Sequence, residues 1–520
     1  MNAVAQSAKT VGVSQRRGRF SVNLLANLGY LGVSMLVGVW YVPFLVKHLG
    51  AAAYGLVPLA STLTSYMSLI TLGLNAAVGR SLTIALEQGD DRRANGIFNT
   101  SLWGSLALNV ALLLPAGLGL VYLDKLIQVP AGYETQARWL FAGVVAAFLL
   151  NEVKTPFDVS SYCRNRFDLR NLVAVAEIFA RVGLVLVLFN FLTPTIGYVG
   201  LAILCGTIVS MIGASYLWRA LTPSLQVQLR AFDSGVLKEL VSTGGWVIVI
   251  QLGAILYLGI DLVLANRLFG PEQSGKFAAV LQLPLLIRSV GSAIGGVFSP
   301  TVLYYYSRND LDGLLTYLQR AVKCVGLMLA LPIGLMCGFA EPLLRLWLGA
   351  GFAYLSPLLF LMAAHLCVNM AINPLLGLQV ATNRVKTPGI VTLLMGLGNL
   401  GLALLLAGPM GWGLYGIAGA GAIMLTLKNV LFTPIYAAHV MGKPWISFLR
   451  ELAPIVAVTG LTIAAGRAMA LAWPMTGWIE LGAAAMIISG AYGLAVLQWA
   501  LSPEERAMFR KLLRRQPAQL

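Results

Sequence analysis

Few ionisable side chains interrupt the long apolar runs of this sequence, and those few are the candidates for chemistry. Arg288 lies in the middle of the apolar run 277–299, and Ser292, Gly295 and Ser299 follow it along one helix face. A charge at the centre of a bilayer costs at least ~2.5–3.5 kcal/mol on insertion scales, which marks such a residue as functional. We predict that Arg288 binds a phosphate group or an acidic sugar through its guanidinium. The alternative is a lock between helices.

Two further charged pairs have the i,i+4 spacing of helix neighbours. Lys154 and Asp158 share a face of the apolar run 139–158, so Lys154 either contacts an anionic substrate or pairs with Asp158. Glu177 and Arg181 have the same spacing, and for them an internal salt bridge is the expectation.

Three other charged residues lie outside such i,i+4 pairs. Lys428 has no acidic residue four positions away and is expected to face a substrate-binding crevice. Arg80 ends a glycine-rich segment, where it either contacts phosphate or extends its charge to the membrane surface. Asp261, with Arg267 as a nearby partner, could take up H⁺ or Na⁺ as a coupling ion, or form a structural hydrogen bond.

Polar uncharged side chains add one more stripe. His365, Asn369 and Asn373 follow one another at four-residue spacing just before Pro374, and they would bind sugar hydroxyls or join helices. The three histidines are too scattered for a metal site, and no phosphate-binding loop for ATP occurs. We therefore expect no catalytic site, no metal and no cofactor other than a coupling H⁺ or Na⁺.

The elements that carry these residues are membrane spans. Of 520 residues 58% are hydrophobic and 11% charged, against about a quarter charged in soluble proteins. A bilayer core of about 30 Å needs about 20 apolar helical residues. Fourteen runs reach this length, or twelve to thirteen if weak ones are discounted. They lie near 22–46, 53–78, 98–122, 139–158, 171–192, 197–218, 244–266, 277–299, 320–340, 355–380, 388–408, 412–436, 452–472 and 478–500.

The net charge of +16 has a topological explanation. With both termini inside, 23 of the 36 Lys and Arg residues fall in cytoplasmic segments and 7 outside. The excess is therefore a signal of orientation in the cytoplasmic membrane, and no nucleic-acid partner is expected.

An internal repeat relates the two halves of the chain. Marker residues recur at an offset of 220, pairing Gly50 with Gly270, Gly55 with Gly275, and Asp90 with Asp310. The same offset maps Arg288 onto Ser68 and Gly295 onto Asn75, so Ser68 and Asn75 join the substrate-binding candidates.

The repeat predicts an all-α integral membrane protein with two six-helix lobes, related by a pseudo-twofold axis along the membrane normal. Two extra helices follow. The expected divisions are a basic cytoplasmic tail at 1–20, an N-lobe at 21–230, a C-lobe at 231–440, the extra spans at 441–500, and a basic tail at 501–520. Two lobes with a crevice between them favour transport by alternating access.

Six segments carry a resemblance to a known family. They are Leu45–Gly55 (LVKHLGAAAYG), Gly73–Arg80 (GLNAAVGR), Asp261–Gly270 (DLVLANRLFG), Glu341–Gly349 (EPLLRLWLG), Ala381–Pro388 (ATNRVKTP) and Gly413–Ala418 (GLYGIA). Together they resemble the oligosaccharide flippases of the polysaccharide transporter family, in the multidrug, oligosaccharidyl-lipid and polysaccharide (MOP) exporter superfamily. The resemblance implies movement of undecaprenyl-pyrophosphate-linked sugars to the periplasmic leaflet of the inner membrane, for O-antigen or exopolysaccharide assembly.

Two other functions remain open at this point. A cation-coupled multidrug exporter of the same superfamily is the first, although Arg288 and Lys428 would repel cationic drugs. A membrane polysaccharide polymerase or ligase is the second, but the long periplasmic loop and paired catalytic groups expected of one are missing from the sequence. Expected partners are the lipid-linked oligosaccharide, membrane lipids and other polysaccharide-assembly proteins.

Overall fold

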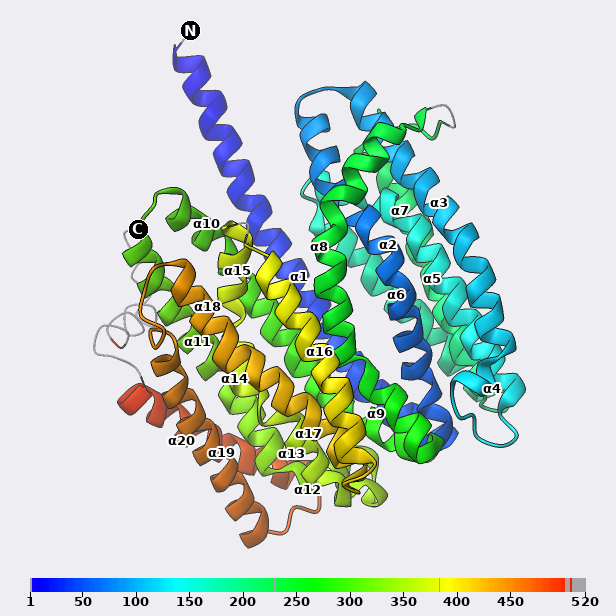
Figure 1. Cartoon of the computed structure of the whole chain (residues 1–520), viewed down its shortest axis with the longest axis vertical. Coiled ribbons are helices and arrows are strands. Elements are labelled where there is room, and N and C mark those ends of the chain that lie inside the picture. Colours follow the sequence, from blue (N-terminus) through cyan, green and yellow to red (C-terminus); the bar gives the residue numbers. More distant parts are fainter. Residues whose placement is uncertain (1, 229–230, 383, 501–505, 507–520) are drawn as a thin grey trace. The chain divides into compact units, whose positions relative to one another are not determined.

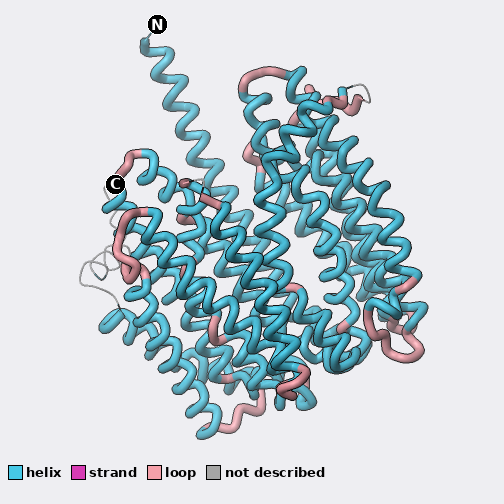
Figure 2. The backbone as a smooth tube through the Cα atoms, viewed as in Figure 1, coloured by secondary structure: helices cyan, strands magenta, loops and turns pink. Residues whose placement is uncertain are grey.

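The protein is built from helices. The computed structural model describes residues 2–228, 231–382, 384–500 and 506, and in that part of the chain no strand occurs (Figures 1 and 2). Helices suit an apolar chain in a membrane because each span closes its own backbone hydrogen bonds.

The described residues of the first half of the chain form eight α-helices. They are α1 (Asn2–Tyr54), α2 (Leu56–Glu87), α3 (Asp91–Val121), α4 (Leu123–Leu126), α5 (Glu134–Cys163), α6 (Phe167–Phe191), α7 (Ile196–Leu221) and α8 (Ser234–Leu258).

The second half has shorter and more interrupted elements. They are α9 (Ile260–Gly296), α10 (Ser299–Ser307), α11 (Leu311–Gly338), α12 (Ala340–Leu348), α13 (Ser356–Ala363), α14 (Leu366–Ala371), α15 (Asn373–Ala381), α16 (Lys386–Ala407), α17 (Gly413–Thr426), the π-helical turn η3 (Leu427–Phe432), α18 (Thr433–Val440), α19 (Leu452–Ala472) and α20 (Trp478–Ala495). The single span expected at 355–380 is thus divided into three helices.

Twelve helical segments of the described chain are long and apolar enough to cross a membrane. One of them, Ile248–Ser307, has 60 residues, a length sufficient for two crossings. The span expected at 53–78 coincides with α2, which is not among the twelve. The structure therefore confirms a helical multispan protein, and the count of fourteen remains a prediction.

The chain divides into two compact units. Unit 1 comprises Met1–Ile255 and Ala265–Gly275, and unit 2 comprises Leu256–Leu264 and Lys276–Leu520. The lobe and tail boundaries expected from the repeat remain predictions.

The repeat markers adopt matching backbone conformations. Gly50 breaks α1 with φ 78° and ψ 161°, and Gly270 breaks α9 with φ 85° and ψ 175°. Only glycine adopts a positive φ readily, which explains the residue type at both breaks. Asp90 and Asp310 both act as N-caps, accepting from the backbone N–H three residues onward at 2.9 Å.

Close glycine contacts hold unit 1 around these breaks. A Cβ built on Gly55 would lie 2.6 Å from the Cα of Gly275, and one on Gly275 would clash with the carbonyl oxygen of Ala51. Asn266 fixes the same segment, since its Oδ1 accepts from Gln128 N at 2.7 Å.

Asparagine side chains fasten the connector that follows α7 in unit 1. Asn95 Nδ2 donates to Ser224 O at 2.9 Å, and its Oδ1 accepts from Gln226 N at 2.8 Å. Asn99 repeats the pattern one helical turn later, to Gln226 O at 2.8 Å and from Gln228 N at 2.7 Å. The two side chains pair with the connector as a neighbouring strand would.

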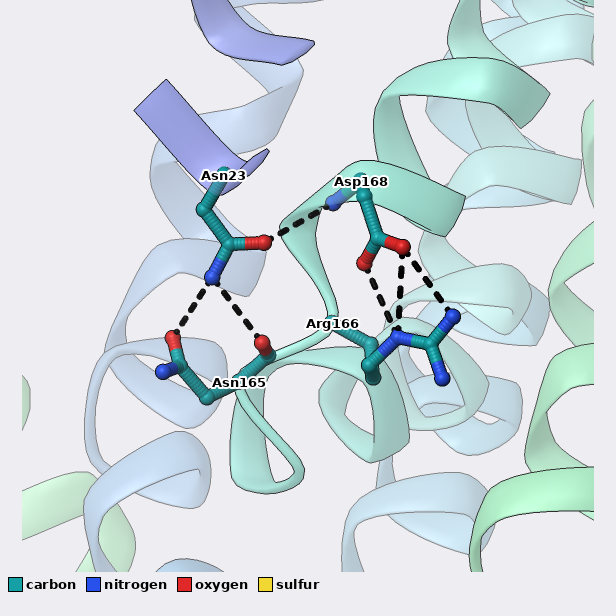
Figure 3. A network of polar contacts seen from close by, with 4 residues as sticks. All are labelled: Asn23, Asn165, Arg166 and Asp168. Carbon is teal, nitrogen blue, oxygen red and sulfur yellow. Dashed lines mark hydrogen bonds and ion pairs between the residues drawn. The ribbon is translucent and has the colours of Figure 1, made fainter. Parts of the chain in front are cut away.

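Another asparagine, Asn23, joins α1 to the start of α6 (Figure 3). Asn23 Nδ2 donates to Asn165 O at 3.0 Å, and Asn23 Oδ1 accepts from Asp168 N at 3.2 Å. Asp168 also forms an ion pair with Arg166 at 2.9 Å. Asn23 therefore supplies the cap that no side chain of α6 itself provides.

In unit 2 the two C-terminal spans pack against α11. Gly338 lies against Gly466 of α19, where a Cβ built on either residue would come within 3.0 Å of the other's Cα. Tyr492 of α20 donates its hydroxyl to Leu327 O at 2.5 Å. These spans are thus integral parts of unit 2.

Replacing Gly275 by Ala tests the glycine contact in unit 1. The added methyl group meets backbone atoms, which cannot move aside as a flexible side chain can, so we expect destabilisation of roughly 1–3 kcal/mol or more. The apparent melting temperature of the purified protein in detergent should fall by several degrees. The matched control is Gly29→Ala in α1, where a Cβ has nothing within 4 Å. Equal melting temperatures for the two variants would contradict the packing argument.

Candidate functional site

The ionisable residues singled out in the second half of the chain gather in unit 2. Asp261 lies in the first turn of α9, just after the N-cap residue Gly259, and Arg288 lies in the second part of the same helix. The charge of Arg288 acts on Tyr257, Asp261 and His365, which come from three different segments. These residues form the core of what we call the C-unit site.

Asp261 is held between α16 and α17. Asn399 Nδ2 donates to Asp261 Oδ1 at 3.2 Å and to Leu256 O at 3.1 Å. The other carboxylate oxygen, Oδ2, lies 3.3 Å from the point where a Cβ on Gly421 would be, and Asn399 Oδ1 lies 3.8 Å from it. Two oxygens therefore converge on the notch left by Gly421.

The Asn399 amide oxygen is itself unusual. The side chain of Asn399 is fully buried, and its Oδ1 has no hydrogen-bond partner in the described structure. An unpartnered buried acceptor is costly, so the notch suits a donor proton or a small cation with oxygen ligands.

Among the described residues, Arg288 has no counter-ion at bonding distance. Its Nε is buried without a hydrogen-bond partner, and no ion pair joins it to any residue that the structure describes. Its role in binding an anion remains a prediction, as does the alternative of a lock between helices.

Lys428 lies in an irregular segment of helix. The turn η3 is a π-helix, and Thr433 Oγ1 donates to Lys428 O at 3.2 Å across it. Lys428 Nζ stands 5.4 Å from the ring centroid of Tyr257, so it belongs to the C-unit site. π-Helical turns are frequent at functional sites.

The stripe expected from His365, Asn369 and Asn373 is divided. The ring Nδ1 of His365 lies 2.7 Å from Asn369 Nδ2, which also donates to Thr426 Oγ1 at 3.1 Å. Asn373 begins α15 and instead lines a separate cavity with Ser292 and Ser299.

That cavity follows the face predicted to continue from Arg288. Ser292, Gly295, Gly296, Ser299, Asn373 and Gly377 line its about 310 Å³. A Cβ built on Gly296 would have nothing within 4 Å, so a polar ring could approach the backbone closely at that residue.

The candidates from the first half of the chain have other surroundings. Lys154 pairs with Asp158 at 3.2 Å and donates to Ser210 Oγ at 2.9 Å, so the pairing alternative is observed. Ser68 donates to its own helix at Ser65 O, 2.8 Å away, and Arg80 is exposed. Asn75 lies outside the residues whose side chains are described. Their roles in substrate binding remain predictions.

The expected salt bridge between Glu177 and Arg181 is wrong. No ion pair joins these two described side chains, and Arg181 Nε is buried without a hydrogen-bond partner. Its charge instead acts on Tyr41 of α1, whose hydroxyl is also buried and unpartnered. A spacing of four permits a pair but does not fix the side-chain directions.

Sequence reasoning missed Asn399, Thr426 and Asn429. Asn429 is buried, and its Nδ2 donates to Asn369 O at 3.5 Å. The available signal was a lone amide or hydroxyl inside an apolar span, which is weaker than a charge but also costly in a membrane.

Comparisons with known proteins agree with this architecture. A protein from Bacillus subtilis (strain 168), named uncharacterized membrane protein EpsK, is 34% identical over 497 residues, covering 96% of this chain and 98% of the relative. The lipid II flippase MurJ in an inward closed conformation matches with a TM-score of 0.65 and 14% identity, over 95% of this chain and 99% of its own.

A third match is an inward-facing multidrug resistance MATE family transporter of the MOP superfamily. Its TM-score is 0.60 at 16% identity, over 84% of this chain and 98% of its own. The family described as polysaccharide biosynthesis protein matches residues 22–303. The chain therefore belongs to this polysaccharide biosynthesis family, and it has the fold of the MOP superfamily transporters.

Proposed function

We propose that this protein is a flippase, which moves undecaprenyl-pyrophosphate-linked oligosaccharide from the cytoplasmic to the periplasmic leaflet by alternating access. Family membership supports a place in polysaccharide biosynthesis, and the fold supports transport rather than catalysis. The observation that carries the substrate class is the lone guanidinium of Arg288.

Arg288 favours an anionic substrate for an electrostatic reason. A cation among membrane spans is costly unless an anion compensates it, and in the described part of the chain Arg288 has no such partner at bonding distance. A pyrophosphate offers several oxygens that match the planar guanidinium fork. Lys428 adds a second positive charge to the same site, which favours a doubly charged anion.

Asp261 is proposed as the site of the coupling ion. Its Oδ2 and the free Asn399 Oδ1 meet at the Gly421 notch, where they could hold Na⁺, or where Asp261 could bind H⁺. The attraction between Asp261 and Arg288 links ion binding to substrate binding.

The cavity lined by Ser292, Ser299 and Asn373 is proposed to take a sugar unit of the substrate. Its hydroxyl and amide groups suit sugar hydroxyls, and it continues the helix face that carries Arg288. Within this proposal both termini lie in the cytoplasm, and the partners are membrane lipids and other polysaccharide-assembly proteins.

A multidrug exporter is the second candidate, because a MATE family transporter has the same fold. Arg288 and Lys428 argue against it, since a site with two cations repels the positively charged drugs such exporters usually carry. A polymerase or ligase finds less support still, because the family and fold comparisons point to transporters.

Replacing Arg288 by Ala tests the anion site. Loss of charge-assisted hydrogen bonds worth about 1.5–3 kcal/mol should lower delivery of lipid-linked sugar to the periplasmic face by roughly 10–100-fold. Delivery can be measured in membrane vesicles as accessibility of the sugar to an externally added glycosidase. Arg345→Ala is the control, because Arg345 is an exposed arginine already paired with Glu341 at 2.7 Å. Full delivery by a normally inserted Arg288→Ala protein would remove Arg288 from the mechanism.

Filling the Gly421 notch tests the ion site without removing a charge. Gly421→Ala places a methyl group 3.3 Å from Asp261 Oδ2, so stimulation of delivery by an imposed Na⁺ or H⁺ gradient should be lost, as it should in Asp261→Asn. Delivery down a substrate gradient should continue in both variants. Gly419→Ala is the control in the same helix, with an ordinary 3.7 Å contact to Leu361. A wild type without ion dependence, or an Asp261→Asn variant that keeps it, would defeat the proposal.

A further inference from the structure

The short helix α10 of unit 2 has faces with different surroundings. It packs against both α11 and α15 (Figure 1). Ser299 and Leu303 of α10 line the cavity that is proposed to take a sugar unit. Residues four and then three positions onward lie on one face of a helix, so Tyr306 shares the face of Ser299 and Leu303. A tyrosine therefore stands one turn beyond the lining of this cavity.

Aromatic contacts fix the rotation of α10 about its own axis. Tyr305 packs against Tyr317 of α11, with ring centroids 5.6 Å apart. Phe298, which directly precedes α10, contacts the same Tyr317 ring at 6.0 Å. Val302 lies on this side of the helix and is fully buried. One face of α10 is thus anchored to α11, and the face that carries Tyr306 is left beside the cavity.

The facing wall of the cavity is formed by α15, which runs in the same direction as α10. A Cβ built on Gly295 would lie 2.6 Å from Asn373 Cβ, and one on Gly377 would lie 3.2 Å from Ser299 Oγ. Both contacts join residues that are 78 positions apart in the sequence. The two walls are therefore parallel and keep a constant register along the cavity.

Tyr306 lies at the mouth of this cavity. The register places Ala381, the last residue of α15, opposite Leu303, so α10 continues past the end of the facing wall. The side chain of Tyr306 is 41% exposed, and no hydrogen bond or ring contact joins it to another residue that the structure describes. A phenol ring is therefore available to a ligand at the place where the cavity opens.

A neighbouring tyrosine has different surroundings. Tyr304 is also exposed, but its ring is engaged by the guanidinium of Arg308, 4.4 Å from the ring centroid, and by the edge of Tyr305 at 5.7 Å. Exposed tyrosines are common at the edge of a membrane, so exposure alone does not indicate a ligand. Tyr306 differs because its ring is free and its helix face is the one that lines the cavity.

We propose that Tyr306 stacks on a second sugar ring of the substrate while the first ring occupies the cavity, an inference that rests on the proposed function. The negative face of a phenol attracts C–H groups, which cover one face of many pyranose rings. The helix rises about 10 Å from Ser299 to Tyr306, which is more than a single ring spans. Tyr306 is thereby a specificity-determining residue, which favours a lipid that carries several sugars over one that carries a single sugar.

Binding of one lipid in two forms tests this proposal. The lipid-linked oligosaccharide is extracted from cells that make the polysaccharide, and a portion is trimmed with exoglycosidases to the sugar next to the pyrophosphate. Each form is added to the purified full-length protein, and its retention is measured by native mass spectrometry. The wild type should bind the untrimmed form roughly tenfold more tightly than the trimmed form. Tyr306→Ala should lose this difference, because its binding of the untrimmed form alone is weakened.

Three further variants make the test specific to the aromatic ring. Tyr306→Phe keeps the ring and should bind both forms as the wild type does. Tyr304→Ala removes an exposed tyrosine from another face of α10 and is the matched control, which should change neither affinity. Arg288→Ala should weaken both forms, because both carry the pyrophosphate.

Two results would overturn the role of Tyr306. One is a Tyr306→Ala protein that still prefers the untrimmed form, and the other is a variant that loses both forms equally. A wild type that binds neither form would instead defeat the proposed function, and this inference with it.

Discussion

The apolar interior of a membrane offers no water to backbone amides and carbonyls, so each span of this chain has to close its own hydrogen bonds. Polar groups are therefore concentrated where helices are interrupted. Asp261 follows the break at Gly259, His365 stands between α13 and α14, and Lys428 lies in a π-helical turn. The C-unit site is the meeting point of these interruptions. In an uninterrupted helix the backbone N–H and C=O groups bond to one another, so fewer of them would be available to a ligand in the C-unit site.

The two repeats share a helix break, at Gly50 and at Gly270, but they differ in the polar side chains near the equivalent positions Tyr41 and Asp261. The offset of 220 places Tyr41 where unit 2 has Asp261. Each of the two residues interacts with the fifth of the six spans expected in its own repeat, which is α6 for Tyr41 and α16 for Asp261. Tyr41 lies within reach of the Arg181 charge, whereas Asp261 accepts from the neutral amide of Asn399. Unit 1 therefore holds a covalently attached cation at this position. Unit 2 offers oxygens instead, which is the arrangement expected if only one of the two niches exchanges an ion.

The sequence predicted those features that depend on local spacing and on the cost of charge. The long apolar runs predicted helices, and the repeat paired Gly50 with Gly270, which the structure shows to break their helices in the same way. Partners from distant spans could not be inferred. Asn399 is 138 residues from Asp261, and a neutral amide carries little signal in an apolar run. The failed pair Glu177–Arg181 shows the same limit, because the directions of the two side chains depend on packing against other helices, which sequence spacing does not reveal.

In the proposed mechanism one electrostatic interaction connects the ion site with the substrate site. Asp261 attracts Arg288 within unit 2, so an ionised carboxylate competes with a pyrophosphate for the same guanidinium. Na⁺ or H⁺ bound at the Gly421 notch would neutralise that carboxylate and strengthen the field of Arg288 on an anion. Thermodynamic linkage makes the effect reciprocal, since the bound anion then stabilises the cation by the same free energy. Because the medium between them has a low dielectric constant, the charges interact over longer distances than in water, and no contact between the two ligands is required.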